Sequence, residues 1–345
     1  MTDNREPVSI GRKPAPERLA VTGIGNALLD VIMQDHDDVH AQLGLAKGGM
    51  TLIDLPRAHE IYGSMSSTLE MSGGSAANTI AGIASLGGSC GFIGKVGDDN
   101  FGEVFAHDLS SLGATVDLTV AQADELGTGR CHVFVTDDAE RTMATYLGAA
   151  NQMEPEDITS DLLKYSDIVY IEGYLFDLPP AKDALRSAIA TAHDHDGLVA
   201  FTLSDLFCVE RHKKDFLELI VNDVDILLAN EGEILTMFDV KTVEQAFEAI
   251  DELGVLGVVT TGSKGAMVSG PRGPLLVPAP KVDRVVDQNG AGDLFAAGFL
   301  YGLASGAEPA EAAQLAAMCA GEIITHLGAR PEADLYEMAA AAGLL

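Results

Sequence analysis

The 345-residue sequence is poor in positive charge. Lys and Arg together number 21 against 52 Asp and Glu, so the formal net charge is −31. A surface this acidic repels phosphate backbones and anionic lipid headgroups, which argues against nucleic acid and membranes as partners. We therefore expect a small-molecule ligand. If that ligand is itself anionic, backbone N–H groups, helix N-termini, a metal and a few chosen cations must hold it.

Closely spaced cysteines and long apolar runs are also missing. The four cysteines, at positions 90, 131, 208 and 319, stand far apart, which excludes a local metal knuckle or redox pair and predicts four small buried residues. No apolar run is long enough to span a membrane. Residues 1–18 are polar and contain no apolar core of a signal peptide. We expect a disordered tail over residues 1–18 and a cytoplasmic protein.

Hydrophobic residues make up 47% of the chain, and from residue 19 onward apolar runs alternate with helical patterns. Strands are predicted at 19–25, 167–172, 198–203, 225–228 and 255–260, and helices at 180–195, 213–221, 243–253, 291–304, 309–326 and 332–342. This alternation predicts one α/β domain over 19–345, with a mostly parallel sheet covered on both faces.

Two segments depart from the alternation of strand and helix. From about 31 to 56, and again from about 118 to 147, polar and apolar residues alternate as they do in antiparallel strands with one exposed face. Residues 131–136 and 142–147 face each other across an acidic turn and predict a hairpin. We expect these segments to form a small lid outside the main sheet.

The most informative motif is Asp287-Gln-Asn-Gly-Ala-Gly-Asp293, followed by a helical pattern. The N–H groups of Gly290, Ala291 and Gly292, together with the positive end of the helix, would form a cradle for an anion. Asp293 beside that cradle could accept a proton from an attacking hydroxyl. The alternative is that Asp293 only stabilises the helix N-terminus.

Two further segments suit a ligand rich in hydroxyl groups. Asn26 and Asp30 follow the first strand, at the edge where open α/β sheets bind ligands. In Ser72-Gly-Gly-Ser-Ala-Ala-Asn78, Gly73 and Gly74 allow a close approach to the backbone, and Asn78 offers both a donor and an acceptor. An ordinary turn and an ordinary glycine loop before a helix explain the same residues.

Two later strand ends carry nucleotide-like signals. Asn230 and Glu233 form a helix-capping pattern, and Glu233 could instead hold magnesium through water. The segment from Thr261 through Gly262 to Gly265 suits either a nucleotide loop or a simple hairpin. In both segments the residues alone leave the two alternatives open.

Two other nucleotide-binding classes fit poorly. Gly23-Ile-Gly25 follows a predicted strand, but Leu28 stands where the third glycine of the dinucleotide fingerprint belongs. Residues 257–264 read G-x-x-x-x-G-S-K, whereas the phosphate loop of Walker-type NTPases requires G-K followed by Ser or Thr. We therefore set aside an oxidoreductase and a Walker-type NTPase.

Taken together, these segments resemble the ribokinase family of carbohydrate kinases, also called the PfkB family. Residues 73–102 are similar to its first signature and residues 286–295 to its second, and the likeness runs from about 20 to about 330. The resemblance implies a three-layer α/β/α fold with a β-sheet lid. Within the family the chain looks most like adenosine kinases and their bacterial relatives, through words such as Glu140-Arg-Thr-Met143 and Ile171-Glu-Gly-Tyr-Leu-Phe176.

The resemblance implies a transfer of the ATP γ-phosphoryl group to a primary hydroxyl, with adenosine converted to AMP as the first expectation. Asp293 would be the base, and Arg141 would reach over the transferred phosphate from the lid. Ribose hydroxyls would be bound by Asn26, Asp30, Gly73, Gly74 and Asn78, and ATP with Mg²⁺ by Asn230, Glu233, Thr261, Gly262, Gly265 and Asp287.

The resemblance leaves several alternatives open. Phe176 and Phe207 would either wall a base pocket or serve as core aromatics. Ribose, fructose, ketodeoxygluconate, inosine and guanosine are alternative substrates. A non-catalytic sensor would need no Asp293. Gln288 replaces a usual Thr, which puts a monovalent cation such as K⁺ in question. The lid strands could pair in a homodimer, and a monomer is equally compatible with the sequence.

Overall fold

The computed structural model describes residues 18–36, 38–121, 126–138, 140–158 and 161–345. The predicted tail lies outside the described residues as far as residue 17. The first described residue, Arg18, donates from its Nε to the Asp167 carboxylate at 2.8 Å, and it donates to the carbonyl oxygen of Ser166 as well. These bonds hold the residue before the first strand against the start of strand β9 (Ser166–Glu172).

The main sheet has nine strands, in the order β14-β13-β12-β11-β10-β9-β1-β5-β6. The seven strands from β12 to β6 pair in parallel, and the short strands β13 and β14 add an antiparallel edge. The strands are β1 (Leu19–Ile24), β5 (Cys90–Gly97), β6 (Thr115–Ala121), β9 (Ser166–Glu172), β10 (Leu198–Thr202), β11 (Ile226–Asn230), β12 (Leu256–Thr260), β13 (Ala266–Val268) and β14 (Leu275–Val277).

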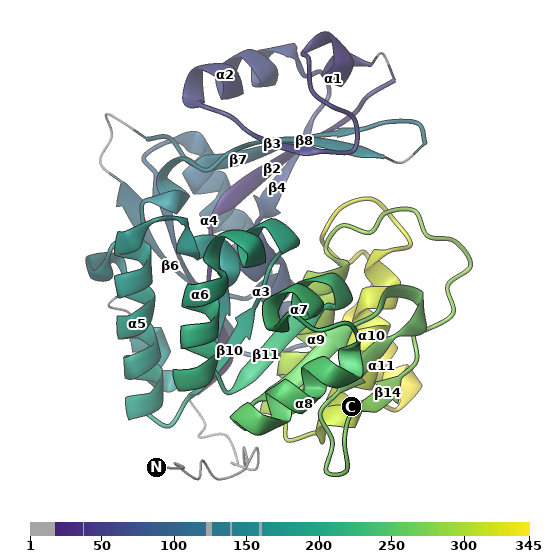
Figure 1. The fold of residues 1–345 in the computed structure, drawn as a ribbon. Coiled ribbons are helices and arrows are strands. Elements are labelled where there is room, and N and C mark those ends of the chain that lie inside the picture. Colours follow the sequence, from purple (N-terminus) through teal and green to yellow (C-terminus); the bar gives the residue numbers. More distant parts are fainter. Residues whose placement is uncertain (1–17, 37, 122–125, 139, 159–160) are drawn as a thin grey trace.

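Helices cover both faces of this sheet (Figure 1), because the strands are apolar on both sides. One core packs α3 (Ser75–Ser85), α4 (Asn100–Ser111), α9 (Ala291–Ala304), α10 (Pro309–Ile323) and α11 (Leu335–Ala342) against the sheet. The other core packs α5 (Pro179–Asp194), α6 (Leu206–Asn222), α7 (Glu231–Phe238) and α8 (Val243–Leu253) against the opposite face. The predicted three-layer α/β/α arrangement is confirmed.

A second sheet projects from one end of the main sheet as a lid (Figure 1). Its order is β3-β8-β7-β2-β4, and β7 and β8 form the predicted antiparallel hairpin. The strands are β2 (Leu28–Gln34), β3 (Met50–Leu52), β4 (Leu69–Gly73), β7 (Gly129–Val135) and β8 (Arg141–Tyr146). The helices α1 (Val39–Gln42) and α2 (Leu55–Ser64) accompany it, and Ile61 of α2 packs on Met33 and Phe134 of the sheet.

The lid differs from its predicted extent in two ways. Residues 118–121 belong to β6 and pair with β5 in the main sheet, so the lid begins later than the alternating pattern indicated. The lid also takes in β4, which pairs with β2 in antiparallel register and leads directly into α3. Pattern alone does not separate an edge strand of one sheet from a strand of the next, because both are half-exposed.

Helix boundaries follow local capping chemistry. The Asp99 side chain accepts the N–H of Gly102 at the start of α4, and Thr242 accepts the N–H of Gln245 at the start of α8. Helix α8 ends at Gly254, which takes the left-handed conformation at φ +70°. Short 3₁₀ turns η1 to η5 lie at Gly148–Asn151, Pro155–Asp157, Asp161–Tyr165, Gly173–Asp177 and Gly262–Lys264.

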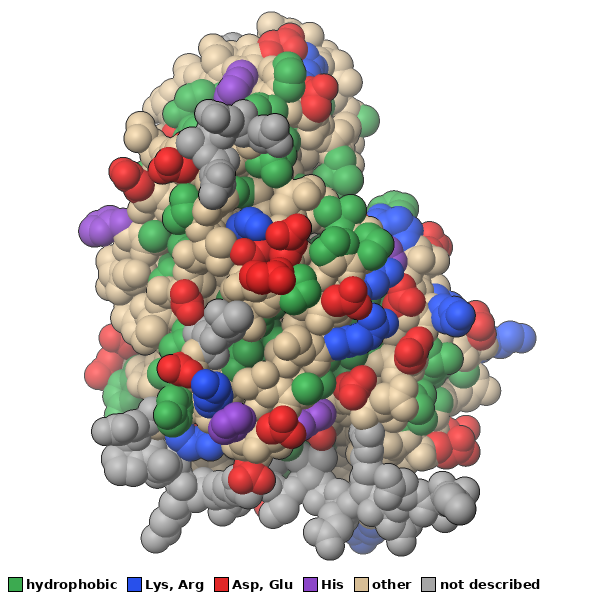
Figure 2. Space-filling view, turned by 90° about the vertical axis from the view of Figure 1, so that its left-hand side faces the viewer, with side chains coloured by type: hydrophobic (Ala, Val, Ile, Leu, Met, Phe, Trp, Pro, Cys, Tyr) green, Lys and Arg blue, Asp and Glu red, His purple; other side chains and the backbone are tan. Residues whose placement is uncertain are grey.

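Three composition-based expectations can be compared with the structure. All four cysteines are free and buried, as predicted for small core residues. Across the described ranges, the helices are too short or too polar to span a membrane. Acidic side chains are spread over the visible face from the lid to the lower body in Figure 2, in keeping with the net charge of −31.

Candidate active site

The predicted cradle lies at the N-terminus of α9. Gly290 caps the helix at φ +74°, and a Cβ there would lie 2.9 Å from the Cβ of Ala329, so both conformation and space require glycine. A Cβ on Gly292, in contrast, would meet no atom within 4 Å. Open space therefore lies in front of the positive end of this helix, which is where an anion would bind.

Asp293 lies in the first turn of α9, half-buried beside that space. Its two carboxylate oxygens accept from the Ser75 hydroxyl at 2.7 Å and from the Asn78 side-chain amide at 2.8 Å. Burial raises the pKa of Asp293, while these two bonds and the charge of Arg330 oppose the rise. A carboxylate held in this way can serve as a general base.

Asp30 of β2 lies near Asp293, because the glycines that precede α3 allow β2 to approach this helix closely. Gly74 caps α3 at φ +93°, where any side chain would collide with the carbonyl oxygen of Asn26. A side chain on Gly73 would overlap the carboxylate of Asp30. The two glycines thus let β2 and β4 approach closely. Burial raises the pKa of Asp30 to about 6, and the charges of Arg330 and Arg141 oppose that effect.

Glu172, to which no role is assigned from the sequence, holds this corner together. One of its oxygens accepts both the backbone N–H and the side-chain amide of Asn26, each at 2.8 Å. The other accepts the N–H of Ala76 at 2.8 Å. Burial raises the pKa of Glu172 to about 7, against the lowering effect of these bonds. Its position at the carboxyl end of β9 is the one sequence signal that could have identified it.

Asn26 retains one unsatisfied group. Its side-chain oxygen is buried and has no hydrogen-bond partner in the described part of the chain, while its amide donates to Glu172. A buried acceptor without a partner is unfavourable unless a ligand supplies the donor. The side-chain oxygen of Asn26 is therefore suited to accept a hydrogen bond from a hydroxyl group of a ligand.

Arg141 reaches from β8 of the lid to the loop before α9, where it forms an ion pair with Asp287. Asp287 also accepts the N–H groups of Asn289 and Gly328, each at 3.0 Å. Burial lowers the pKa of Arg141, and the neighbouring Asp30 raises it. The pair ties the lid to the segment that carries the cradle. Gln288, beside Asp287, is exposed.

Two predicted nucleotide segments lie at the ends of adjacent strands, since Asn230 of β11 is in register with Thr260 of β12. Asn230 and Glu233 form the expected capping box, and burial raises the pKa of Glu233 to about 7. Thr261 bonds to the carbonyl oxygen of Gly265 through its N–H at 2.8 Å, closing the turn between β12 and β13. Gly262 and Gly265 both take positive φ, at +61° and +108°.

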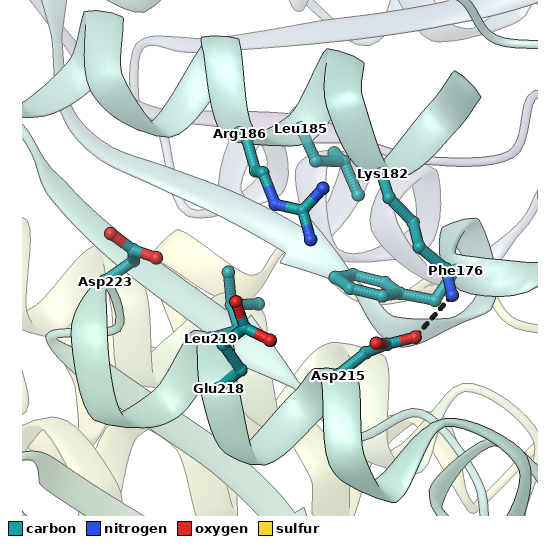
Figure 3. Close-up of a pocket in the computed structure, with 8 residues that line it drawn as sticks. All are labelled: Phe176, Lys182, Leu185, Arg186, Asp215, Glu218, Leu219 and Asp223. Atoms are coloured by element: carbon teal, nitrogen blue, oxygen red, sulfur yellow. Dashed lines mark hydrogen bonds and ion pairs between the residues drawn. The ribbon is translucent and has the colours of Figure 1, made fainter. Parts of the chain in front are cut away.

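Phe176 and Phe207, the two aromatic residues predicted for a base pocket, do not lie with the residues around Asp293. Phe176 packs edge-on against Phe201 and Phe216 in the core between α5 and α6, with ring centroids 5.7 and 5.1 Å away. The hollow beside it in Figure 3, bordered by the Lys182–Asp215 ion pair, has a volume of about 30 Å³, too small for a purine base. These contacts favour the core interpretation for Phe176. Phe207 is 66% exposed at the start of α6.

A larger groove, of about 720 Å³, runs between the 280–283 loop, α10 and α11. Pro280 forms part of its wall, and a Cβ on Gly321 of α10 would lie 2.5 Å from the Cγ of that proline. The residues predicted from the sequence as site residues do not line it. The groove is therefore separate from the constellation around Asp293.

Residues 45–334 match the family described as pfkB family carbohydrate kinase. The chain belongs to this family. The match includes the glycine loop before α3, the lid hairpin and the segment from Asp287 to Asp293. The family assignment and the nine-stranded sheet with its separate lid confirm the predicted resemblance.

Individual relatives agree on kinase chemistry and differ in substrate. The crystal structure of adenosine kinase from Sinorhizobium meliloti superimposes with a TM-score of 0.86 at 41% identity, covering 94% of this chain and 99% of that one. Adenosine kinase from Saccharomyces cerevisiae is 28% identical over 82% of this chain and 88% of its own. An ATP-dependent ribose-1-phosphate kinase from Halopiger xanaduensis is 31% identical over 79% and 87%.

We predict that Gly292→Ala will separate activity from stability. The new methyl group would project into the open space before α9, so phosphoryl transfer should fall about 10²-fold or more, while stability should change by less than about 1 kcal/mol. Gly63→Ala is the matched control, since Gly63 is also helical and its Cβ would likewise meet no neighbour. Kinase assays and thermal denaturation of both variants test this, and normal turnover of Gly292→Ala would contradict the cradle.

We also predict a pH-dependent contribution of Glu172 to stability. Its folded-state pKa of about 7 exceeds the ordinary 4.5, so the folded state binds more protons between these values. The stabilising contribution is present below the ordinary pKa and is lost as pH rises through 7. Relative to Glu172→Gln, the wild type should lose up to about 3 kcal/mol of unfolding free energy between pH 5 and pH 8.

Urea denaturation at both pH values measures this difference. Glu103→Gln, on the exposed first turn of α4, serves as the control and should show no such trend. If the difference in unfolding free energy between the wild type and Glu172→Gln stays constant with pH, the raised pKa of Glu172 is contradicted.

Proposed function

We propose that the protein is an ATP-dependent nucleoside kinase that converts adenosine to AMP. The bond between the γ-phosphorus and its bridging oxygen would break, releasing ADP, and a new bond would form to the 5′-oxygen of the nucleoside. The hydroxyl proton would pass to Asp293. The observation that carries this proposal is the carboxylate of Asp293 beside the open space at the N-terminus of α9, bonded to Ser75 and Asn78.

In this proposal the protein contributes mainly by positioning and by charge stabilisation. Asp293 must be ionised to accept the proton, and its hydrogen bonds from Ser75 and Asn78 favour that form. The N-terminus of α9, with Gly290, Ala291 and Gly292, would stabilise negative charge on the transferred group. Arg141 would add a cation from the lid, and its Nε and Nη1 have no hydrogen-bond partner among the described residues.

The proposed sugar site combines acceptors from three elements. Asp30 from β2 and the side-chain oxygen of Asn26 can accept hydrogen bonds that ligand hydroxyl groups donate, and Asn78 from α3 adjoins the base. Gly73 and Gly74 leave room for a ligand close to the backbone. Paired acceptors of this kind suit the vicinal hydroxyls of a ribose ring.

We assign the nucleotide to the strand ends beside this site. Asn230, Thr261, Gly262 and Gly265 would hold ATP, with Asp287 beside its phosphates. Magnesium supplies positive charge to the phosphates when it is bound with ATP. Both Glu233 oxygens already accept from Asn230, at 2.9 and 2.5 Å, so Glu233 fits a magnesium ion through water rather than by direct contact. Asp287 is likewise engaged by Arg141, which makes it a poor ligand for a K⁺ ion in this arrangement.

Adenosine is preferred as the substrate because the likeness at 41% identity, over nearly the whole of both chains, is to an adenosine kinase. A sugar kinase is the second candidate, since the relatives include a ribose-1-phosphate kinase and a 5-dehydro-2-deoxygluconokinase at 31% and 27% identity. Exposed Phe207 is the remaining candidate from the sequence for an aromatic contact with a base.

Asp293→Asn tests the proposed base. The amide cannot accept the hydroxyl proton, so turnover should fall by about 10³-fold or more while ATP affinity remains close to that of the wild type. Asp251→Asn, an exposed change on α8, is the control and should leave both unchanged. Steady-state assays and ATP titration measure the two quantities. Near-normal turnover of Asp293→Asn would remove Asp293 from the role of base.

A substrate panel tests the specificity. Adenosine, inosine, guanosine, ribose, fructose and ketodeoxygluconate are compared by coupled ADP release, with Asp293→Asn as the blank for contaminating activity. We expect kcat/KM for adenosine to exceed that for each other substrate by at least about tenfold. A sugar that matches or exceeds adenosine would replace it as the proposed substrate, and no ADP release with any compound would overturn the proposed kinase activity.

A further inference from the structure

Arg330 is a half-buried arginine in the substrate site that no sequence motif predicts. It follows α10 in the segment Gly328-Ala-Arg330, about 250 residues from the groups it contacts. Its Nη1 donates to the side-chain oxygen of Asn78, and its Nη2 donates to the backbone oxygen of Ser72 and to the Ser72 hydroxyl at 2.7 Å. The C-terminal part of the chain thereby supplies a cation to a site built mainly by the N-terminal half.

This contact determines which end of Asn78 faces the base. A side-chain amide has an acceptor end and a donor end, and a free one can rotate to exchange them. Arg330 has donors only, so the oxygen of Asn78 must face it. The amide nitrogen is then directed to Asp293, to which it donates at 2.8 Å. A rotated Asn78 would leave two donors facing each other at Arg330 and an acceptor facing the carboxylate.

Arg330 is itself held in place by a second anchored group. The Ser72 hydroxyl and N–H donate to the same oxygen of Asp108 on α4, at 2.5 and 2.8 Å. Ser72 can therefore offer its hydroxyl lone pairs to Arg330 rather than its proton. The side chain of Arg330 is thus fixed between β4, α3 and α4, and its buried Nε has no hydrogen-bond partner within the ranges that the structure describes.

The charge of Arg330 opposes the accumulation of negative charge in the site. Burial raises the pKa of both Asp30 and Asp293, and Arg330 opposes the rise at each. Arg330 remains protonated although burial lowers its pKa. The groups that face or influence Asp293 are Ser75, Asn78 and Thr79 of α3, Asp30 of β2, Tyr170 and Glu172 of β9, Tyr174 of η4, and Arg330.

We propose that Arg330 is a positioning residue for phosphoryl transfer, which turns the amide of Asn78 toward Asp293 and places a positive charge near that carboxylate. The inference rests on the proposed function, in which Asp293 accepts the hydroxyl proton. Without the cation, the Asp293 carboxylate near Asp30 would hold its proton to higher pH, so a smaller fraction of it would be ionised to act as a base at pH 7.

Two substitutions separate the two parts of this role. Arg330→Gln removes the charge and keeps a donor, and Arg330→Lys keeps the charge but cannot reach Asn78 and Ser72 with two separate nitrogens. For Arg330→Gln we expect kcat at pH 7 to fall about 10²-fold and the acidic limb of its pH profile to move to higher pH. For Arg330→Lys the limb should stay near its wild-type position while kcat falls about tenfold. KM for ATP should change less than threefold in both.

The matched control is Arg130→Gln. Arg130 of the lid strand β7 is a buried arginine outside this site, where it lies over the Phe101 and Tyr146 rings and near Asp99, and burial also lowers its pKa. Its loss should reduce stability and leave the acidic limb in place. If all three variants lose stability alike and none moves the limb, the effect of Arg330 is purely structural and the proposal is overturned.

A second readout requires no turnover. Carboxyl ¹³C NMR of aspartate-labelled protein, with Asp293→Asn used for assignment, follows the titration of Asp293 directly. Its midpoint should move to higher pH in Arg330→Gln and stay near the wild-type value in Arg330→Lys. An unchanged midpoint in Arg330→Gln overturns the proposal even if the wild type phosphorylates adenosine. A wild type inactive on every panel substrate overturns the proposed function instead, while the titration still decides the electrostatic role of Arg330.

Discussion

The site depends on one contact between two helix starts. The Asp293 carboxylate at the beginning of α9 accepts hydrogen bonds from Ser75 and Asn78 at the beginning of α3, 218 and 215 residues away in sequence. Each helix start is capped by a glycine with positive φ, and at Gly74 and Gly290 a side chain would collide with the backbone oxygen of Asn26 or with Ala329. The two segments can therefore approach closely enough to share a carboxylate.

Two kinds of positive potential offset the acidity of the molecule at this point. The N-terminus of α9 contributes through its backbone dipole, and Arg141 and Arg330 contribute as half-buried cations from the lid and from the segment after α10. Of their carboxylate neighbours, Asp30 is buried and Asp293 is half-buried, so these charges lie close to opposite charges, and Asp293 also accepts two hydrogen bonds. Because such interactions are strongest away from water, the negative surface charge has a limited effect on them.

Much of the fold was predictable because it follows from local chemistry. The apolar runs and glycine breaks located β1, β9, β10 and β12 to within about two residues, and the predicted helices at 243–253 and 291–304 match α8 and α9. The lid was predicted only in part. Strand β4 was missed and residues 118–121 were placed in the wrong sheet, since half-exposed strands look alike whichever sheet they join.

The motif from Asp287 to Asp293, the glycines before α3 and the family to which they point could be recognised without coordinates, because they depend on backbone conformations that few residues can adopt. The bond between Glu172 and Asn26, the contact of Arg330 with Asn78 and the packing of Phe176 in the core became visible only in the folded chain. The physical reason is distance along the chain. A charge inside the protein is recognised by the partners that surround it, and the hydrogen-bond partners of Glu172 and Arg330 lie 96 to 258 residues away in the sequence.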